Sequence, residues 1–262
     1  MEYIGYFASI LIGVALGLIG GGGSILTIPI LVYLFQVNPK LATTYSLFVV
    51  GFTASIGAVQ HYRMGNIKLK SAVLFAIPSL ITLLLVRKII LPLVPETLFT
   101  FNGFLLTKDG FIMALFAVLM IAASYSMIKN SKELFVTSDT NPLKVALIGA
   151  LVGIATGFLG AGGGFLIIPV LLFFTGITMK QAVGTSILII SFNSLLGFLG
   201  DVVNGVTIDY EFLILVTAFA TVGIFIGTLL SKKIDGNKLK PAFGWFVLVM
   251  GFYIITKELF LK

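Results

Sequence analysis

The stretch Gly20–Pro29 reads GGGGSILTIP and interrupts a long apolar segment with four consecutive glycines. At an offset of 140 residues, Gly160–Pro169 reads GAGGGFLIIP. Glycine loses more backbone entropy on folding than any other residue, so two such runs at matching places are not ordinary helix sequence. Paired glycine interruptions in two halves of a membrane chain are a strong sequence pointer to a binding site. We therefore expect a site where the two stretches meet.

The composition is that of a membrane protein. Apolar residues make up 58% of the 262 residues, charged residues make up 10%, and the mean hydropathy is +1.14. The apolar runs are continuous rather than alternating, which favours helices over a β-barrel. The sequence therefore predicts an all-α polytopic membrane protein with eight apolar segments, at about 4–35, 43–60, 71–94, 110–128, 143–175, 182–200, 211–231 and 242–260.

The chain consists of two related halves. Gly13–Leu31 and Gly153–Leu171 are identical at ten of nineteen positions without a gap. Later the register slips by ten residues, because the first half carries extra sequence around residues 94–108. We expect one integrated membrane domain with an N-terminal repeat over 1–128, a polar connecting loop over 129–142 and a C-terminal repeat over 143–262.

Loop charges predict that segments 4–35 and 143–175 fold back as hairpins. As straight helices they would be roughly 48–50 Å long, against a bilayer core of about 30 Å. Straight crossings divide the seventeen Lys and Arg residues eight against nine. Hairpins give eleven on one side and six on the other, which is the asymmetry expected of cytoplasmic loops. This arrangement makes the repeats inverted, gives about ten helical pieces and places both termini outside.

Several classes of function are excluded by composition and motif. The net charge of +7 lies in short loops, where it orients the chain and contacts anionic lipid, so nucleic acid is not an expected partner. The absence of cysteine excludes disulfides and thiolate metal sites. No Gly-Lys-Ser/Thr follows the glycines, which excludes a P-loop. We predict no catalytic residues, cofactor or metal, and we expect the first apolar segment to be retained because it lacks a basic n-region and a cleavage site.

The glycine stretches are expected to bind a ligand through backbone amides. After each run the chain resumes as a helix toward Pro29 or Pro169, and its first turn presents unpaired N–H groups and the positive end of its dipole. Such a terminus binds an oxyanion without a charged side chain. Close helix packing is the alternative role of glycine, and we favour it for the pairs Gly13/Gly17, Gly153/Gly157 and Gly223/Gly227.

Hydroxyl side chains open the helix that follows each glycine segment, in Thr43-Thr44-Tyr45-Ser46 and Gly184-Thr185-Ser186. Helix capping explains them as well as anion binding does. Ser46 and Ser186 recur at matching positions, which favours a role in lining the site. The predicted substrate-binding residues are Gly20, Gly21, Gly22, Gly23, Ser24, Ser46, Gly160, Gly162, Gly163, Gly164, Thr185 and Ser186.

Three polar residues are candidates for ion coupling or gating: His61, Asn193 and Asp201. His61 is the single histidine, and Asp201 occupies its equivalent position in the second half. Both lie at the ends of apolar segments, where we expect them to be solvated at the membrane interface. Proton coupling through His61 is the alternative.

These residues resemble the TauE/SafE family, the sulfite-exporter or small sulfur-containing anion permease superfamily of bacterial inner membranes. The resemblance rests on Gly17–Ser24 with Pro29, on Gly157–Gly164 with Pro169, and on Gly184-Thr185-Ser186, and the two-half layout fits the whole chain. The first half departs from the pattern at Thr44, and it has Leu83 and Arg87 where the second half has Gly223 and Gly227. The resemblance implies a multi-pass permease for sulfite, thiosulfate or an organosulfonate.

We predict a secondary transporter of small oxyanions with a midplane site between the glycine breaks. Three alternatives remain: an anion channel on the same fold, a membrane subunit of a larger complex, and an intramembrane serine protease. The protease hypothesis would use Ser24 or Ser186 as nucleophile and His61 as base. It is disfavoured because Ser24 corresponds to Gly164 in the repeat and only one histidine exists.

Overall fold

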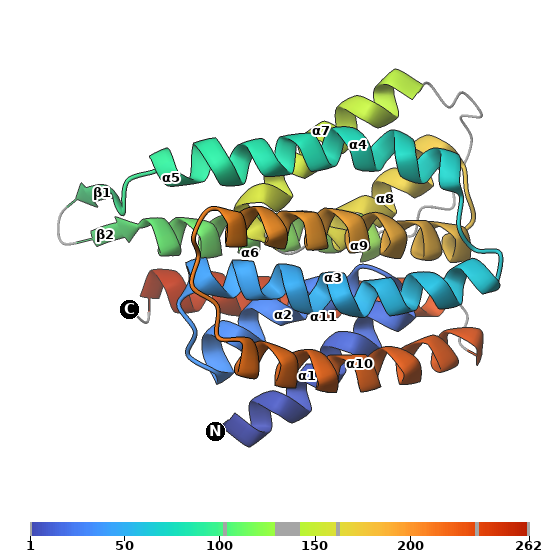
Figure 1. The fold of residues 1–262 in the computed structure, drawn as a ribbon, viewed down its shortest axis with the longest axis horizontal. Helices are drawn as coiled ribbons and strands as arrows, with labels where there is room; N and C mark the ends of the chain where they lie inside the picture. The colour runs from blue at the N-terminus through green and yellow to red at the C-terminus, as the bar shows by residue number, and fades with distance from the viewer. Residues whose placement is uncertain (1, 102–103, 129–141, 161–162, 234–235, 261–262) are drawn as a thin grey trace.

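The computed structural model describes residues 2–101, 104–128, 142–160, 163–233 and 236–260, which are almost entirely helical (Figure 1). The helices lie close to the predicted apolar segments. They are α1 Glu2–Ile19, α2 Gly22–Pro29, α3 Pro39–Arg63, α4 Leu69–Leu85, α5 Leu91–Leu93, α6 Lys108–Ile128, α7 Pro142–Leu159, α8 Gly164–Thr175, α9 Met179–Val203, α10 Tyr210–Lys233 and α11 Gly236–Phe260. Two π-helical segments, η1 Ile30–Leu34 and η2 Val86–Ile90, continue α2 and α4.

A short β-hairpin accounts for the extra sequence of the first half. Strands β1 Thr97–Phe101 and β2 Phe104–Thr107 pair antiparallel. Both are rich in threonine and phenylalanine, which favour strands. The apolar pattern did not predict this hairpin, because its strands are too short to stand out from the neighbouring apolar segments.

Both glycine-containing segments fold back, as the loop charges predict. A Cβ built on Gly5, near the start of α1, would lie 2.5 Å from the ring of Phe35, just after η1. One built on Gly23 in α2 would lie 2.4 Å from the carbonyl oxygen of Ile12 in α1. In the second half, a Cβ on Gly163 would lie 2.0 Å from Cγ2 of Thr156 in α7. The first segment is therefore a helical hairpin of α1 with α2 and η1, and the second is one of α7 with α8.

The helix contacts follow an inverted two-fold pattern. Helix α1 packs on α10, and in the other half its counterpart α7 packs on α4, the counterpart of α10. The other two main contacts join each helix to its own counterpart, α3 to α9 and α6 to α11. In Figure 1, α1 begins at the lower left and α7 at the upper right, and they run in opposite directions. The start of α1, the end of α11 and the β-hairpin share one end of the bundle, which we call the termini end. The predicted division at 129–142 lies outside the described residues except for Pro142.

The small-xxx-small pairs pack helices together, as predicted. A Cβ on Gly13 of α1 would lie 1.8 Å from the carbonyl oxygen of Ala220 in α10. In the other direction, a Cβ on Gly223 of α10 would lie 2.0 Å from the carbonyl oxygen of Ile10 in α1. A Cβ on Gly153 of α7 would lie 2.2 Å from the carbonyl oxygen of Ser79 in α4. These contacts let α1 approach α10, and α7 approach α4, at backbone distance.

Gly13→Leu is expected to destabilise the protein strongly. Overpacking a close contact typically costs about 1–3 kcal/mol, and here the neighbour is backbone that no rotamer change can move. Thermal unfolding of the purified protein in detergent measures the loss. Val222→Leu on α10 is the control, because Val222 is 53% exposed. Unfolding of both variants at the same temperature would contradict the packing role.

The outer surface is apolar, as contact with lipid requires. Along α4 the side chains of Val73, Ile77, Ile81 and Leu85 form a stripe that is about half exposed. Within the described residues, six helical runs are long and apolar enough to cross a bilayer: 39–63, 69–93, 108–125, 142–159, 179–203 and 210–231. An exposed apolar surface of this extent indicates that a bilayer covers it.

Candidate functional site

The two glycine turns meet in the interior of the bundle. A Cβ built on Gly164 would lie 2.6 Å from the Cα of Gly21, so the turns touch at backbone distance. A Cβ on Gly20 would lie 2.9 Å from Ser186 Oγ on α9, and one on Gly160 would lie 2.4 Å from the Thr43 carbonyl oxygen on α3. Each turn therefore reaches the central helix of the other half.

Glycine is required at the turns for conformation as well as space. Gly20 has φ +78°, and its counterpart Gly160 has φ +60°. Side chains other than glycine rarely adopt this left-handed region. The two equivalent glycines thus share the left-handed conformation, and each lies at the turn of its helical hairpin.

Helix α2 begins at Gly22 and α8 begins at Gly164, so two helix N-termini lie beside this contact. Neither of these described N-termini receives a side-chain cap, and their N-cap residues are Gly21 and Gly163. The amides of a first helical turn bind anions well. Among the predicted binding residues, Gly162 lies outside the described residues.

The predicted hydroxyl groups differ in their surroundings. Ser46 is buried on α3 and its Oγ has no hydrogen-bond partner in the described structure. Ser186 faces Gly20 and donates to the Val183 carbonyl oxygen at 2.9 Å. Thr185 Oγ1 accepts the Lys68 backbone N–H at 3.0 Å, which ties α9 to the residues before α4. Of these three hydroxyls, Ser46 is the one without any hydrogen-bond partner in the described structure.

Buried polar side chains continue along α3 and α9. Asn193 Nδ2 donates to Ser79 Oγ at 2.8 Å, while its Oδ1 has no partner among the described residues. Ser55 and Ser191 share a 2.7 Å hydrogen bond between α3 and α9. In the described part of the chain no group of three or more His, Asp or Glu residues could hold a metal ion.

His61 is buried rather than solvated, which corrects the expectation of an interfacial position. The residue is 3% exposed on α3, and neither ring nitrogen has a partner in the described structure. The nearby Thr228 Oγ1 is also buried and without a partner there. The position of His61 near a segment end does not expose it, because α10 lies against this end of α3, where Gln60 and Arg63 line one cavity together with Thr228.

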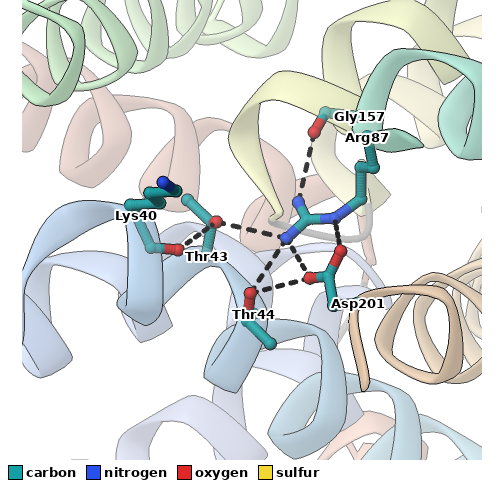
Figure 2. Close-up of polar contacts among 6 residues, drawn as sticks. All are labelled: Lys40, Thr43, Thr44, Arg87, Gly157 and Asp201. Atoms are coloured by element: carbon teal, nitrogen blue, oxygen red, sulfur yellow. Dashed lines mark hydrogen bonds and ion pairs between the residues drawn. The ribbon is translucent and has the colours of Figure 1, made fainter. Parts of the chain in front are cut away.

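Asp201 is likewise buried, in an ion pair with Arg87 (Figure 2). Arg87 Nε donates to Asp201 Oδ1 at 2.7 Å, and Nη2 donates to Oδ2. Thr44 Oγ1 donates to Oδ2 at 2.7 Å, and Arg87 Nη1 donates to the Gly157 carbonyl oxygen at 3.1 Å. The carboxylate and the guanidinium are thus both paired and hydrogen-bonded, as a buried ion pair requires.

The count of loop charges treats all seventeen Lys and Arg residues as lying in loops, and this is wrong for Arg87 and Lys108. Arg87 lies in η2 and is 5% exposed, and Lys108 begins α6 and is 2% exposed. The repeat offers no guide to Arg87, because its counterpart is Gly227. The sequence does contain a signal for this burial, because Arg87 stands inside an apolar run and charged residues within a membrane segment are rare and usually paired.

The Arg87 cluster lies between a cavity and the second glycine turn. Arg87 Nη2 approaches Thr43 Oγ1 at 3.4 Å, and Thr43 contacts the position of Gly160. On its other side is a cavity of about 350 Å³ at the termini end. Its lining residues are Asn38, Lys40, Leu41, Thr44, Arg87, Leu91, Pro92, Lys108, Asp201, Asn204 and Val206.

Comparison with known families agrees with this architecture. The sequence model of the family described as "Sulfite exporter TauE/SafE" matches residues 6–254. The chain belongs to the TauE/SafE family. The resemblance carried by the glycine stretches is thereby confirmed over nearly the whole chain.

Curated relatives of this TauE/SafE chain are named as transporters. A "Probable membrane transporter protein" of Xylella fastidiosa is 32% identical over 255 residues, covering 95% of this chain and 92% of that protein. A protein of the same description in Haemophilus influenzae is 26% identical, and the alignment covers 94% of this chain and 95% of that protein. Another in Methanocaldococcus jannaschii is 25% identical, and the alignment covers 94% of this chain and 92% of that protein. No solved structure matches the chain. The chain is therefore a membrane transporter of the TauE/SafE family.

Proposed function

We propose that this chain is a secondary transporter of small oxyanions, with sulfur-containing anions such as sulfite, thiosulfate or an organosulfonate as substrates. The observation that carries the proposal is the contact of the two glycine turns, with Gly164 at backbone distance from Gly21. The N-termini of α2 and α8 lie at this contact without side-chain caps. Their dipoles and first-turn amides favour an anion, and the family description of a sulfite exporter supports an anion of this class.

The proposed amide donors are Gly22, Gly23 and Ser24 in the first half and Gly162, Gly163 and Gly164 in the second. Gly20 and Gly160 shape the turns instead, because their N–H groups donate to the carbonyl oxygens of Leu16 and Thr156 at 2.7 and 2.9 Å. Ser46 adds a buried hydroxyl without a partner in the described structure, and Ser186 and Thr185 complete the proposed set. Backbone amides bind an oxyanion without carrying a fixed charge through the bilayer. Such a site releases its ligand more readily than one built from paired cations, and a transporter must release what it binds.

We place the protein in the bacterial inner membrane, with the termini end outside. Counted on the sequence, the hairpin arrangement assigns eleven of the seventeen Lys and Arg residues to the opposite end, and an excess of basic residues is expected on the cytoplasmic side. The sequence contains no P-loop, so the proposed transport draws on an ion gradient, on a partner protein or on the gradient of the anion itself.

Isothermal titration calorimetry on the purified protein tests whether such anions bind. Saturable binding of sulfite, thiosulfate or ethanesulfonate is expected, together with thermal stabilisation by the anion that binds. Choline supplied at the same ionic strength is the control, since a cation gains nothing from helix N-termini. Absence of both heat and stabilisation for all three anions would refute the proposal.

A further inference from the structure

The side chains that line the cavity at the termini end are more often basic than acidic. Three basic side chains line it, Lys40, Arg87 and Lys108, against one acidic side chain, Asp201. Glu96 pairs with Lys40 at 3.7 Å, but both side chains are more than half exposed, so this pair is weak. Asp109 Oδ2 accepts a hydrogen bond from Asn38 Nδ2 at 2.9 Å. With Glu96 and Asp109 counted, the acidic side chains around the cavity equal the basic ones in number, so the case for an anion rests on Lys108.

Lys108 is the residue that most needs a counter-charge. It is 2% exposed, and its Nζ donates to the Val94 carbonyl oxygen at 3.1 Å. No carboxylate in the described part of the chain lies within ion-pair distance of it. An ammonium has three donors, and burying one without a paired charge is unfavourable. A bound anion would supply the missing charge and accept the remaining donors.

The rest of the lining suits an anion with a short organic tail. Leu41, Leu91, Pro92 and Val206 form apolar wall, while Asn38 and Asn204 add polar groups. At about 350 Å³ the cavity is within the range of small-molecule sites, and it has room for more than a bare inorganic anion. An organosulfonate matches both the charged and the apolar parts of this lining.

We infer that this cavity is a second anion-binding site, at which a small organosulfonate is held by Lys108 and Arg87 before it reaches the glycine turns. The inference rests on the proposed function for the nature of the substrate. Arg87 connects the two sites, because its guanidinium lines the cavity and also contacts Thr43 and the Gly157 carbonyl oxygen beside the second turn. An anion in the cavity competes with Asp201 for Arg87.

Calorimetry with ethanesulfonate on Lys108→Met tests the site. The substitution keeps an apolar stem and removes the charge, and the affinity of the cavity site is expected to fall about tenfold or more, as loss of a charged hydrogen bond implies. Lys108→Arg keeps the charge and retains binding. Lys40→Met, at the cavity, weakens binding, whereas Lys180→Met is the matched control, because Lys180 is the repeat counterpart of Lys40 and is also exposed.

Variants at the glycine turns separate this site from the central one. In a Gly164→Val background, one ethanesulfonate should still bind, and Lys108→Met should weaken that remaining binding about tenfold or more. Binding that depends on Lys108 but not on Gly164 would support the cavity and refute the central site. Binding that is lost with Gly164→Val and is indifferent to both Lys108→Met and Lys40→Met would overturn the inference.

A gain of affinity provides an independent readout. Asp201→Asn removes the carboxylate that competes for Arg87, so ethanesulfonate should bind about tenfold more tightly to this variant and raise its thermal stability more than that of the wild type. A neutral sulfone of the same size should do neither. Equal stabilisation of Asp201→Asn and wild type by the anion would contradict the competition.

Discussion

Asp201→Asn is expected to lower the free energy of unfolding by about 3–5 kcal/mol, because it leaves the Arg87 guanidinium buried without a counter-ion. Arg87→Leu should have an effect of similar size, since it leaves the Asp201 carboxylate buried without a counter-ion. The double variant Arg87→Leu/Asp201→Leu should be more stable than either single variant. Replacing a buried pair by apolar side chains removes both desolvation penalties together.

Thermal unfolding of the wild type, Arg87→Leu, Asp201→Leu and the double variant in detergent measures the double-mutant cycle, and Asp201→Asn is measured beside them. Glu96→Gln is the control, because it breaks the exposed pair with Lys40 at the same end of the bundle and should change stability by less than about 1 kcal/mol. A double variant no more stable than the single variants would show that the pair does not act as a unit. Single variants as stable as Glu96→Gln would contradict the buried ion pair itself.

Gly164→Val is expected to abolish most anion transport while the helices still form. A Cβ at this position would lie 2.6 Å from the Gly21 Cα, so the two turns must separate. Separation moves the amides of the two helix N-termini away from a common ligand. Losing two hydrogen bonds to a charged ligand, at about 1.5–3 kcal/mol each, lowers affinity about a hundredfold or more.

Uptake of a radiolabelled anion into proteoliposomes measures the effect of Gly164→Val. Gly200→Ala is the matched control, because a Cβ there meets only the movable end of Leu84. Circular dichroism establishes that both variants retain their helices. Transport by Gly164→Val at the rate of Gly200→Ala would show that the contact of the turns is not needed.

Much of this fold follows from the sequence, and the reason is the bilayer. A membrane-spanning segment must be long, apolar and helical, so the eight apolar runs locate the helices within a few residues. The hairpins follow from the loop charges, because segment 4–35 is too long for one crossing and its fold-back restores the charge asymmetry. The packing role of Gly13 and Gly153 follows from their spacing.

The Arg87–Asp201 pair shows where this reasoning fails. Arg87 and Asp201 are 114 positions apart, and the repeat sets them against Gly227 and His61, so symmetry gives no hint that they meet. Rules about loop charge assign every basic residue near a segment end to the interface. Only the helix contacts reveal that α4 and η2 bring Arg87 against the end of α9. The β-hairpin is not predicted either, because its strands are too short to stand out from the apolar segments and the second half has no copy of it for comparison.

Counterflow in proteoliposomes tests the central claim most directly. Vesicles containing the purified protein are loaded with unlabelled sulfite, thiosulfate or ethanesulfonate, and uptake of the same radiolabelled anion is followed from outside. The account predicts saturable uptake that internal anion stimulates, which is the behaviour of a carrier and not of a channel. Uptake no faster than in protein-free vesicles for all three anions would contradict it.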